Sequence, residues 1–204
     1  MEDQPLEHLL EQYRKGDVEA LGHIVDQTRR PLYGFIYGMV RDPHQAEDLF
    51  QDVWIRAIKG LHRYQSDRLL SWLFRIARNR VIDLSRKRKP DASLQQPIGG
   101  NGIGGTGSPD TLESVLPNLD QGPERRTSNR ELALRIQHAV HSLPLEQREV
   151  YLMRTEADMS FKQIAGIQNV SINTSLARMQ YALKYLREAL ADDYHSLNSL
   201  SRNP

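Results

Sequence analysis

Residues 160–174 read SFKQIAGIQNVSINT, and this stretch has the features of a helix-turn-helix. Ser160 and Gln163 have the spacing of a capping box, which begins a helix by satisfying its first backbone amides. Asn169 falls where a tight turn needs a left-handed residue, and Ser171 can cap the helix that follows. The stretch therefore predicts two helices joined by a tight turn, an arrangement that can place its second helix in the major groove of DNA.

The second helix of this motif is predicted to be amphipathic. Its expected inward face consists of Ile172, Leu176, Met179, Leu183 and Leu186. The candidates for DNA contact on the motif are Lys162, Asn173, Thr174, Ala177, Arg178, Gln180, Tyr181 and Lys184. Lys184 is the one cation on the outward stripe, which implies few phosphate contacts and weak binding of duplex DNA by the protein alone. The alternative is a helical hairpin that packs on the helix before it.

Apolar residues also recur at helical spacing from Leu6 to Val40. Asp17 can cap a helix within this region. Pro31 lies inside the pattern, and because proline removes a backbone donor and clashes with the preceding turn, it is expected to kink or break the helix. The region therefore predicts a short helix near Leu6, a second helix after Asp17, and a kink or break at Pro31.

The middle of the chain predicts two longer helices. Asp42 and Pro43 are the N-cap and first-turn proline of one of them, whose apolar face includes Ile58 and which is expected to end at Gly60. A further helix is predicted over residues 69–88. No segment of useful length alternates with the period of two that marks a β-strand, so the fold is predicted to be all-α.

Composition divides the 204-residue chain into four parts. Residues 90–124 hold seven of the 13 Gly and five of the 10 Pro, five acidic side chains, and no basic or aromatic one. Such a segment cannot bury enough apolar surface to offset its ordering entropy, so it is predicted to be a flexible acidic linker. It would join two small helical domains, 1–89 and 125–191, and residues 192–204 would form a polar, frayed tail.

The formal net charge of +1 indicates no partner, but the distribution of charge does. Residues 63–89 hold nine basic side chains and two acidic ones. On the predicted helix, the face opposite the apolar one contains Trp72, Arg75, Arg78, Asn79, Ile82 and Arg86, and Lys87, Arg88 and Lys89 extend it. Cations bind phosphates, an amide reads a base edge and an indole stacks on an exposed base, so the face favours nucleic acid. The alternative is a solvated basic face whose cations complement the helix dipole.

The helix after Asp42 has an outer face of the opposite sign. It consists of Glu47, Asp48, Gln51, Asp52 and Ile55. This face can be a solvated surface with acids in its first turn, or a docking face for a basic protein partner.

Several classes of site are not supported by the sequence. With no Cys, the chain has no disulfide, no cysteine-ligated zinc and no thiol nucleophile. Residues 100–105 match the dinucleotide-binding glycine pattern, but no strand precedes them. His138 and His141 lack a third metal ligand. The acidic N-terminus predicts no signal peptide, and the longest apolar stretch, Leu32 to Val40, is too short to span a bilayer. No catalytic motif is found, so no enzyme activity, metal or cofactor is predicted.

The order of these parts resembles a known family. The segments AEDLFQDVW (46–54) and SWLFRIARN (71–79), a linker and a C-terminal helix-turn-helix resemble the extracytoplasmic-function (ECF) sigma factors of bacterial RNA polymerase. The segments GDVEAL (16–21) and LPLEQREV (143–150) are also similar to that family. The resemblance implies a promoter-specificity subunit that is not an enzyme and that acts in the cytoplasm.

The resemblance also implies roles for the candidate residues. The face with Glu47, Asp48, Gln51, Asp52 and Ile55 would dock on the β′ clamp helices of core polymerase. The −10 element would be met by Tyr64, Trp72, Arg75, Arg78, Asn79, Arg86, Lys87 and Arg88. The helix-turn-helix would enter the −35 major groove and touch the β flap, and the linker would thread towards the active site. An anti-sigma factor would hold the protein inactive.

Two other functions remain open from the sequence. A free-standing helix-turn-helix regulator would need a strongly basic recognition helix and a dimerisation segment, and neither is found. A small enzyme or nucleotide-binding protein would show turnover or nucleotide binding in a direct assay.

Overall fold

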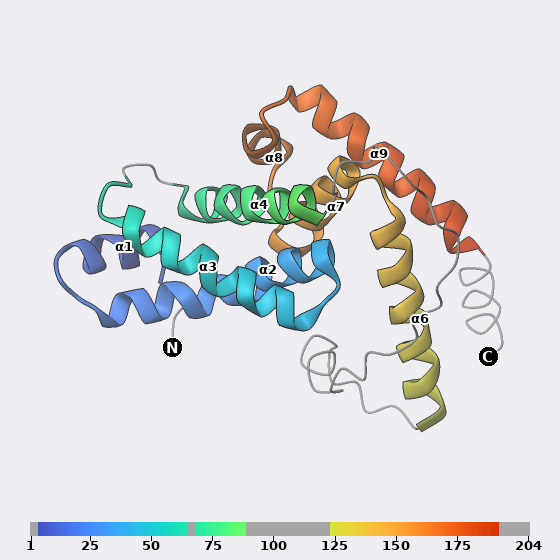
Figure 1. Ribbon diagram of the computed structural model, residues 1–204, viewed down its shortest axis with the longest axis horizontal. Coiled ribbons are helices and arrows are strands. Elements are labelled where there is room, and N and C mark those ends of the chain that lie inside the picture. Colours follow the sequence, from blue (N-terminus) through green and yellow to red (C-terminus); the bar gives the residue numbers. More distant parts are fainter. Residues whose placement is uncertain (1–3, 65–67, 89–122, 192–204) are drawn as a thin grey trace.

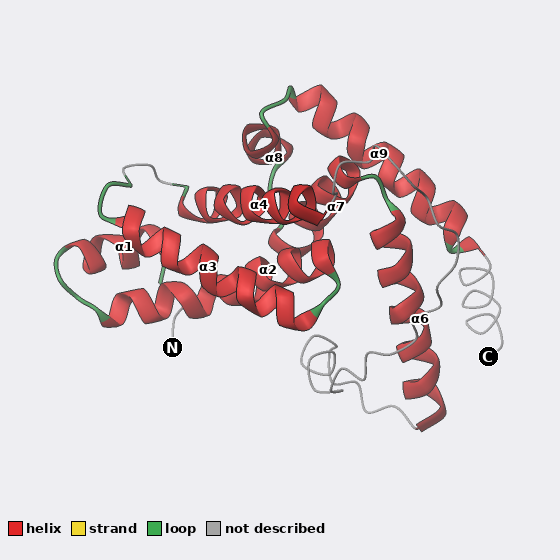
Figure 2. Cartoon of the chain, in the orientation of Figure 1, coloured by secondary structure: helices red, strands yellow, loops and turns green. Residues whose placement is uncertain are grey.

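The computed structural model describes residues 4–64, 68–88 and 123–191, and within these ranges all regular secondary structure is helical (Figures 1 and 2). The all-α prediction is therefore confirmed. The helices are α1 (Leu6–Arg14), α2 (Glu19–Val40), α3 (Pro43–Leu61), α4 (Leu69–Arg88), α6 (Pro123–Ser142), α7 (Leu145–Ala157), α8 (Phe161–Gln168) and α9 (Ile172–Ala189). The predicted linker lies outside the described residues except at its C-terminal edge, where Pro123 begins α6, and the predicted tail lies outside them.

Helices α1 to α4 enclose one apolar core, and α2 contacts each of the other three. The side chains of Phe35 and Phe74 are fully buried, with ring centroids 5.1 Å apart. Helix α2 runs through Pro31 without interruption, so the break expected there does not occur. Leu32 and Ile36 are fully buried just beyond the proline, and their packing offsets the hydrogen bond that proline cannot make.

The predicted N-terminal cap of α3 is confirmed, and its C-terminal end differs by one residue. The carboxylate of Asp42 accepts a hydrogen bond of 3.1 Å from the backbone N–H of Gln45. The helix continues past Gly60 to Leu61, whose side chain is fully buried. Gly60 has a packing role instead, because a Cβ there would lie 3.0 Å from the Trp72 ring.

The helix-turn-helix predicted in the C-terminal half is present as α8 and α9. Ser160 and Gln163 form the capping box, Asn169 has the left-handed φ of 57°, and Ser171 caps α9 by accepting from the backbone N–H of Thr174. These features depend on a few neighbouring residues, which is why the sequence pattern located them.

The buried face of α9 is different from the predicted one. Ser175, Ala182 and Leu186 are buried, whereas Leu176 and Leu183 are exposed. Helices α7 and α8 both pack against α9, and the small side chains of Ser175 and Ala182 allow that approach. The prediction followed the largest apolar residues, but the close packing of three helices favours small ones.

The two halves of the chain are packed together (Figure 1). Helix α2 packs against α7, and α4 packs against α8. At the α2–α7 contact, a Cβ at Gly38 would lie 2.6 Å from Cδ2 of Leu152, whose side chain is buried, and a Cβ at Gly34 would lie 2.5 Å from the carboxylate end of Glu156. This contact brings the helix-turn-helix against the basic helix α4.

Candidate nucleic-acid interface

Helix α4 carries all but one of the residues predicted to contact the −10 element. Arg75, Asn79, Arg86 and Lys87 are exposed, and the side chain of Arg88 lies outside the described part of the structure. The guanidinium of Arg75 donates a 3.4 Å hydrogen bond to the backbone carbonyl of Gly166 in α8. The predicted face is therefore open along part of its length and covered where α8 crosses it.

Two of the predicted residues, Tyr64 and Trp72, form an aromatic pair at the start of α4. Their ring centroids lie 4.8 Å apart with an angle of 30° between the planes, and both rings are half-buried. The Tyr64 hydroxyl also accepts a 3.1 Å hydrogen bond from the backbone N–H of Arg68. The pair supplies a fixed aromatic surface beside the cationic helix, the combination that binds single-stranded nucleic acid.

Arg78 makes a contact that the sequence pattern did not indicate. Its Nε donates to Oε2 of Glu149 in α7 over 2.8 Å, and the side chain of Glu149 has no exposed surface. Gln168 donates to the same oxygen over 2.7 Å and accepts from Arg178 over 2.8 Å. Arg78 and Arg178, predicted to contact two different DNA elements, are thus linked through the carboxylate of Glu149 and the amide of Gln168.

The predicted DNA-contact residues of the helix-turn-helix are mostly polar and carry little charge. Its exposed predicted residues are Lys162, Asn173, Thr174, Gln180, Tyr181 and Lys184, and Ala177 is half-buried beside them. The hydroxyl of Thr174 is 2.8 Å from that of Ser171, within the helix cap. The amides and Tyr181 can form hydrogen bonds with base edges, but the surface provides little charge to neutralise phosphates.

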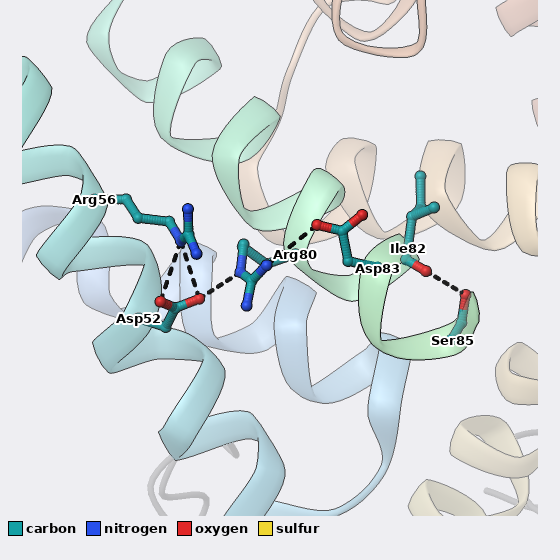
Figure 3. A network of polar contacts seen from close by, with 6 residues as sticks. All are labelled: Asp52, Arg56, Arg80, Ile82, Asp83 and Ser85. Atoms are coloured by element: carbon teal, nitrogen blue, oxygen red, sulfur yellow. Dashed lines mark hydrogen bonds and ion pairs between the residues drawn. The ribbon is translucent and has the colours of Figure 1, made fainter. Parts of the chain in front are cut away.

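The outer face of α3 is divided between free and paired acids. Asp48, Gln51 and Ile55 are exposed, and Glu47 is half-buried and accepts a 3.3 Å hydrogen bond from Gln51. Asp52 pairs with Arg56 over 3.1 Å and with Arg80 of α4 (Figure 3). Of the predicted docking residues, Asp52 is therefore the one whose charge is already balanced within the chain.

The Asp52 network extends along α4. Figure 3 shows Arg80 between Asp52 and Asp83, and its guanidinium donates to Asp83 over 3.1 Å. One turn further along α4, the Ser85 hydroxyl donates to the backbone carbonyl of Ile82. Burial alone would raise the pKa of Asp52, but the hydrogen bonds and charges of Arg80 and Arg56 outweigh it and hold that pKa below its usual value. Asp52 thus joins α3 to α4 as a carboxylate.

An exposed apolar pair was missed by the sequence pattern. Ile58, predicted to lie inward, is 39% exposed, and Ile55 one turn earlier is 53% exposed. The sequence could have indicated this pair, because residues three apart lie on the same side of a helix. The two side chains add an apolar centre to the polar outer face of α3.

No metal or membrane site is found within the described residues. They contain no group of three or more side chains able to hold a metal ion. His141 is bound instead to the guanidinium of Arg148 at 3.1 Å, and burial together with that charge lowers the pKa of His141 to about 4. Among the same residues, every helix is too short or too polar to cross a bilayer.

Comparison with family models matches both halves of the chain in order. The model of sigma-70 region 2 matches residues 24–90, and the model of sigma-70 region 4 matches residues 133–186. The first contains α3, α4 and most of α2, and the second contains α7, α8 and most of α9.

Similar proteins extend this match over nearly the whole chain. The ECF RNA polymerase sigma factor SigW of Bacillus subtilis is 32% identical over 185 residues, which are 90% of this chain and 95% of SigW. SigM of the same species is 28% identical over 170 residues, or 82% of this chain and 94% of SigM.

Solved structures share the fold. CnrH in complex with the cytosolic domain of CnrY has a TM-score of 0.65 and 21% identity, covering 93% of this chain and 99% of CnrH. The sigma factor RpoE of Bartonella quintana, in complex with the anti-sigma factor NepR, has a TM-score of 0.61 and 21% identity over 85% of this chain and 98% of RpoE.

Proposed function

Because the chain belongs to the ECF sigma factors of RNA polymerase, we propose that its separate surfaces meet core polymerase, the −10 element and the −35 element. As a sigma factor it is a promoter-specificity subunit that works with core RNA polymerase and promoter DNA in transcription initiation. Sigma factors are non-catalytic initiation factors, and we assign no reaction to any residue. We also propose that residues 1–89 and 125–191 are its two working domains, joined by the segment 90–124.

The outer face of α3 is the proposed docking site for the β′ clamp helices of core polymerase. Its exposed surface combines the carboxylate of Asp48 and the amide of Gln51 with the apolar pair Ile55 and Ile58. An apolar centre with a polar rim is the usual composition of a protein interface. Asp52, although predicted to dock directly, would act by holding α3 against α4, since its charge is paired with Arg56 and Arg80.

Helix α4 is the proposed site for the −10 element. The exposed amide of Asn79 can read a base edge, and the exposed cations Arg75, Arg86 and Lys87 can bind phosphates. The ring pair of Tyr64 and Trp72 offers a stacking surface for an unstacked base. Melting of the promoter would be driven by this binding energy, because capture of unstacked bases offsets the few kcal/mol that each unstacking costs.

The helix-turn-helix is the proposed binding site for the −35 element. It is also proposed to contact the β flap of core polymerase. Asn173 and Gln180 are exposed amides, and amides pair with adenine in the major groove. Lys184 is an exposed cation of the outward stripe, so the affinity of this half for duplex DNA should be low. Core polymerase would hold both halves at a fixed spacing, which makes two weak contacts act together.

We propose an anti-sigma factor as a further partner, and the cytoplasm as the place where the chain acts with polymerase. RpoE of Bartonella quintana, which shares the fold, was solved with the anti-sigma factor NepR. The nearly complete coverage of SigW, in the order region 2 then region 4, is the observation that carries the whole proposal.

Co-purification with core polymerase tests the proposal. The chain mixed with core should elute with it as one complex on size exclusion, and the complex should initiate transcripts on genomic fragments that core alone ignores. A chain that elutes apart from core and adds no transcripts would contradict it.

A further inference from the structure

The outward side of α9 has a composition that bears on which bases it contacts. Asn173, Ala177 and Gln180 lie on one side of this helix, opposite the buried Ser175 and Ala182. Asn173 and Gln180 are exposed, and Ala177 is half-buried between them. In a helix-turn-helix, the N-terminal residues of the second helix are the ones that contact base edges. The side of α9 that faces the bases therefore presents two amides around a methyl group.

Two larger apolar side chains flank this side of α9. Leu176 is 37% exposed and Tyr181 is 63% exposed. At 3.6 residues per turn, they lie along opposite edges of the stripe that Asn173, Ala177 and Gln180 form. In the major groove, the apolar group that such side chains can contact is the C5-methyl group of thymine. The outward side of α9 thus combines amides with apolar groups over its first three turns.

Cations are few on the same part of α9. Arg178 is the only Arg or Lys among residues 172–183. Its guanidinium donates over 2.8 Å to the side-chain oxygen of Gln168, a buried residue of α8. Lys184 lies beyond the first three turns of α9, and Lys162 lies on α8. Arginine and lysine are the side chains that most often bind guanine in the major groove, so the start of α9 presents no free cation for guanine.

We propose that this chain selects A·T base pairs in the −35 element and makes no arginine contact to guanine there. The amides of Asn173 and Gln180 contact adenine, because an amide matches the donor and the acceptor on its major-groove edge. Leu176, Ala177 and Tyr181 contact thymine, the one unmodified base of DNA with a methyl group in that groove. The inference rests on the proposed −35 role of the helix-turn-helix and names the base pairs that this role requires.

The low charge of this surface makes the base contacts decisive. Phosphate contacts are independent of sequence, and each adds about one unit to the slope of affinity against salt. Lys162 and Lys184 are the exposed cations among the predicted contact residues of the helix-turn-helix, so few such contacts are available. The preference for one −35 sequence over another therefore comes from amide and methyl contacts. Removal of a single methyl group from the DNA should be measurable as weaker binding.

Base analogues that change one group of the DNA test these contacts. The reconstituted holoenzyme selects promoter fragments from a library with a randomised −35 segment, and A·T pairs should be enriched. Deoxyuridine in place of a contacted thymine removes one methyl group and should weaken holoenzyme binding about fourfold. In place of a contacted adenine, 7-deazaadenine removes the N7 acceptor and should weaken binding about fivefold, the net contribution of one hydrogen bond. In place of any guanine, 7-deazaguanine should have no effect.

Substitutions in α9 assign the contacts to residues. Tyr181→Ala removes an exposed ring and should abolish the deoxyuridine effect at one position. Tyr185→Ala makes the same change one turn further from the start of α9, and every deoxyuridine effect should remain. Gln180→Arg places a guanidinium on the outward side and should change the preferred pair at one position from A·T to G·C. The three changed side chains are exposed, so helicity by circular dichroism should be retained.

The possible failures give different results. Enrichment of G·C pairs at the positions that respond to Gln180→Arg would overturn the A·T preference and leave the −35 role standing. A selection that no α9 variant changes would instead contradict the −35 role itself. Deoxyuridine that leaves binding unchanged at every thymine would overturn the methyl contacts. Weaker binding of Tyr181→Ala to core polymerase, with no deoxyuridine effect, would assign this surface to a protein contact and overturn the inference.

Discussion

At the scale of single residues, the structure separates acids that are free to meet a partner from acids that hold the fold. Asp48 and Asp52 lie one turn apart on α3 and look alike in the sequence. Asp48 is exposed, whereas Asp52 pairs with Arg56 and Arg80 and joins α3 to α4. No local pattern distinguishes them, because the partner Arg80 is 28 residues away.

This difference predicts a pH-dependent loss of stability. Because its pKa is lowered in the folded state, Asp52 stabilises the fold above its ordinary pKa of 3.8, and this stability is lost as the pH falls through the lower folded value. Asp52→Asn should lower the free energy of unfolding by about 0.5–1 kcal/mol at neutral pH, since the pair is partly exposed. Urea unfolding from neutral pH to below 3.8 should show this difference shrinking, and Asp48→Asn should show none. A constant difference at every pH would contradict the ion-pair origin.

Asn79 is the residue proposed to read a −10 base. Asn79→Ala removes the amide from an exposed position of α4 and should relax the preference at one base by about 1–3 kcal/mol. Transcription by the holoenzyme from templates carrying each base at each −10 position measures this preference. An unchanged preference at all of them would remove Asn79 from base recognition.

At the scale of elements, the sequence located the helices and their caps well and assigned their faces less well. Asp42, Ser160 and Ser171 cap their helices as predicted, because a cap depends on residues within one turn. The inward faces of α3 and α9 were partly wrong, because tertiary neighbours decide which side is buried. Ile58 is exposed where an inward residue was expected, and Ser175 is buried where large apolar residues were expected instead.

Alanine substitutions at two serines of the helix-turn-helix should change the free energy of unfolding in opposite directions. The Ser175 hydroxyl is buried and has no hydrogen-bond partner among the described residues, so Ser175→Ala should raise the free energy of unfolding by about 1 kcal/mol. Ser160→Ala removes the capping box of α8 and should lower it by about 1 kcal/mol. Urea unfolding of the two variants checks both signs. Destabilisation by Ser175→Ala would indicate that this hydroxyl has a partner after all.

The outer face of α3 gives an element-scale prediction for polymerase binding. Asp48→Arg with Ile55→Arg changes exposed side chains only, so helicity should be retained, while reversed charge and lost apolar contact should weaken core binding at least about tenfold. Asp26→Arg, exposed on α2, is the matched control. The affinity for core is measured by anisotropy of a labelled chain. Normal core binding by the folded double variant would remove this face from the interface.

At the scale of the whole molecule, the sequence pattern did not predict that the two halves pack together. The basic stripe of α4 and the helix-turn-helix were each found from their residues, but nothing local indicated that Glu149 of one meets Arg78 of the other. Their contact spans 71 residues and forms where α2 packs against α7 and α4 packs against α8. The sparse charge of the helix-turn-helix predicts that the chain alone binds promoter DNA poorly.

The most direct test of the account is a three-way titration of a labelled promoter fragment, selected from genomic DNA by the reconstituted holoenzyme. The fragment is titrated at physiological salt with the chain alone, with core polymerase alone, and with both together. We expect tight, sequence-specific binding only when both are present, because core holds the two weak DNA surfaces of the chain at a fixed spacing. Specific binding by the chain alone with sub-micromolar affinity, unchanged when core is added, would contradict the account and favour a free-standing regulator.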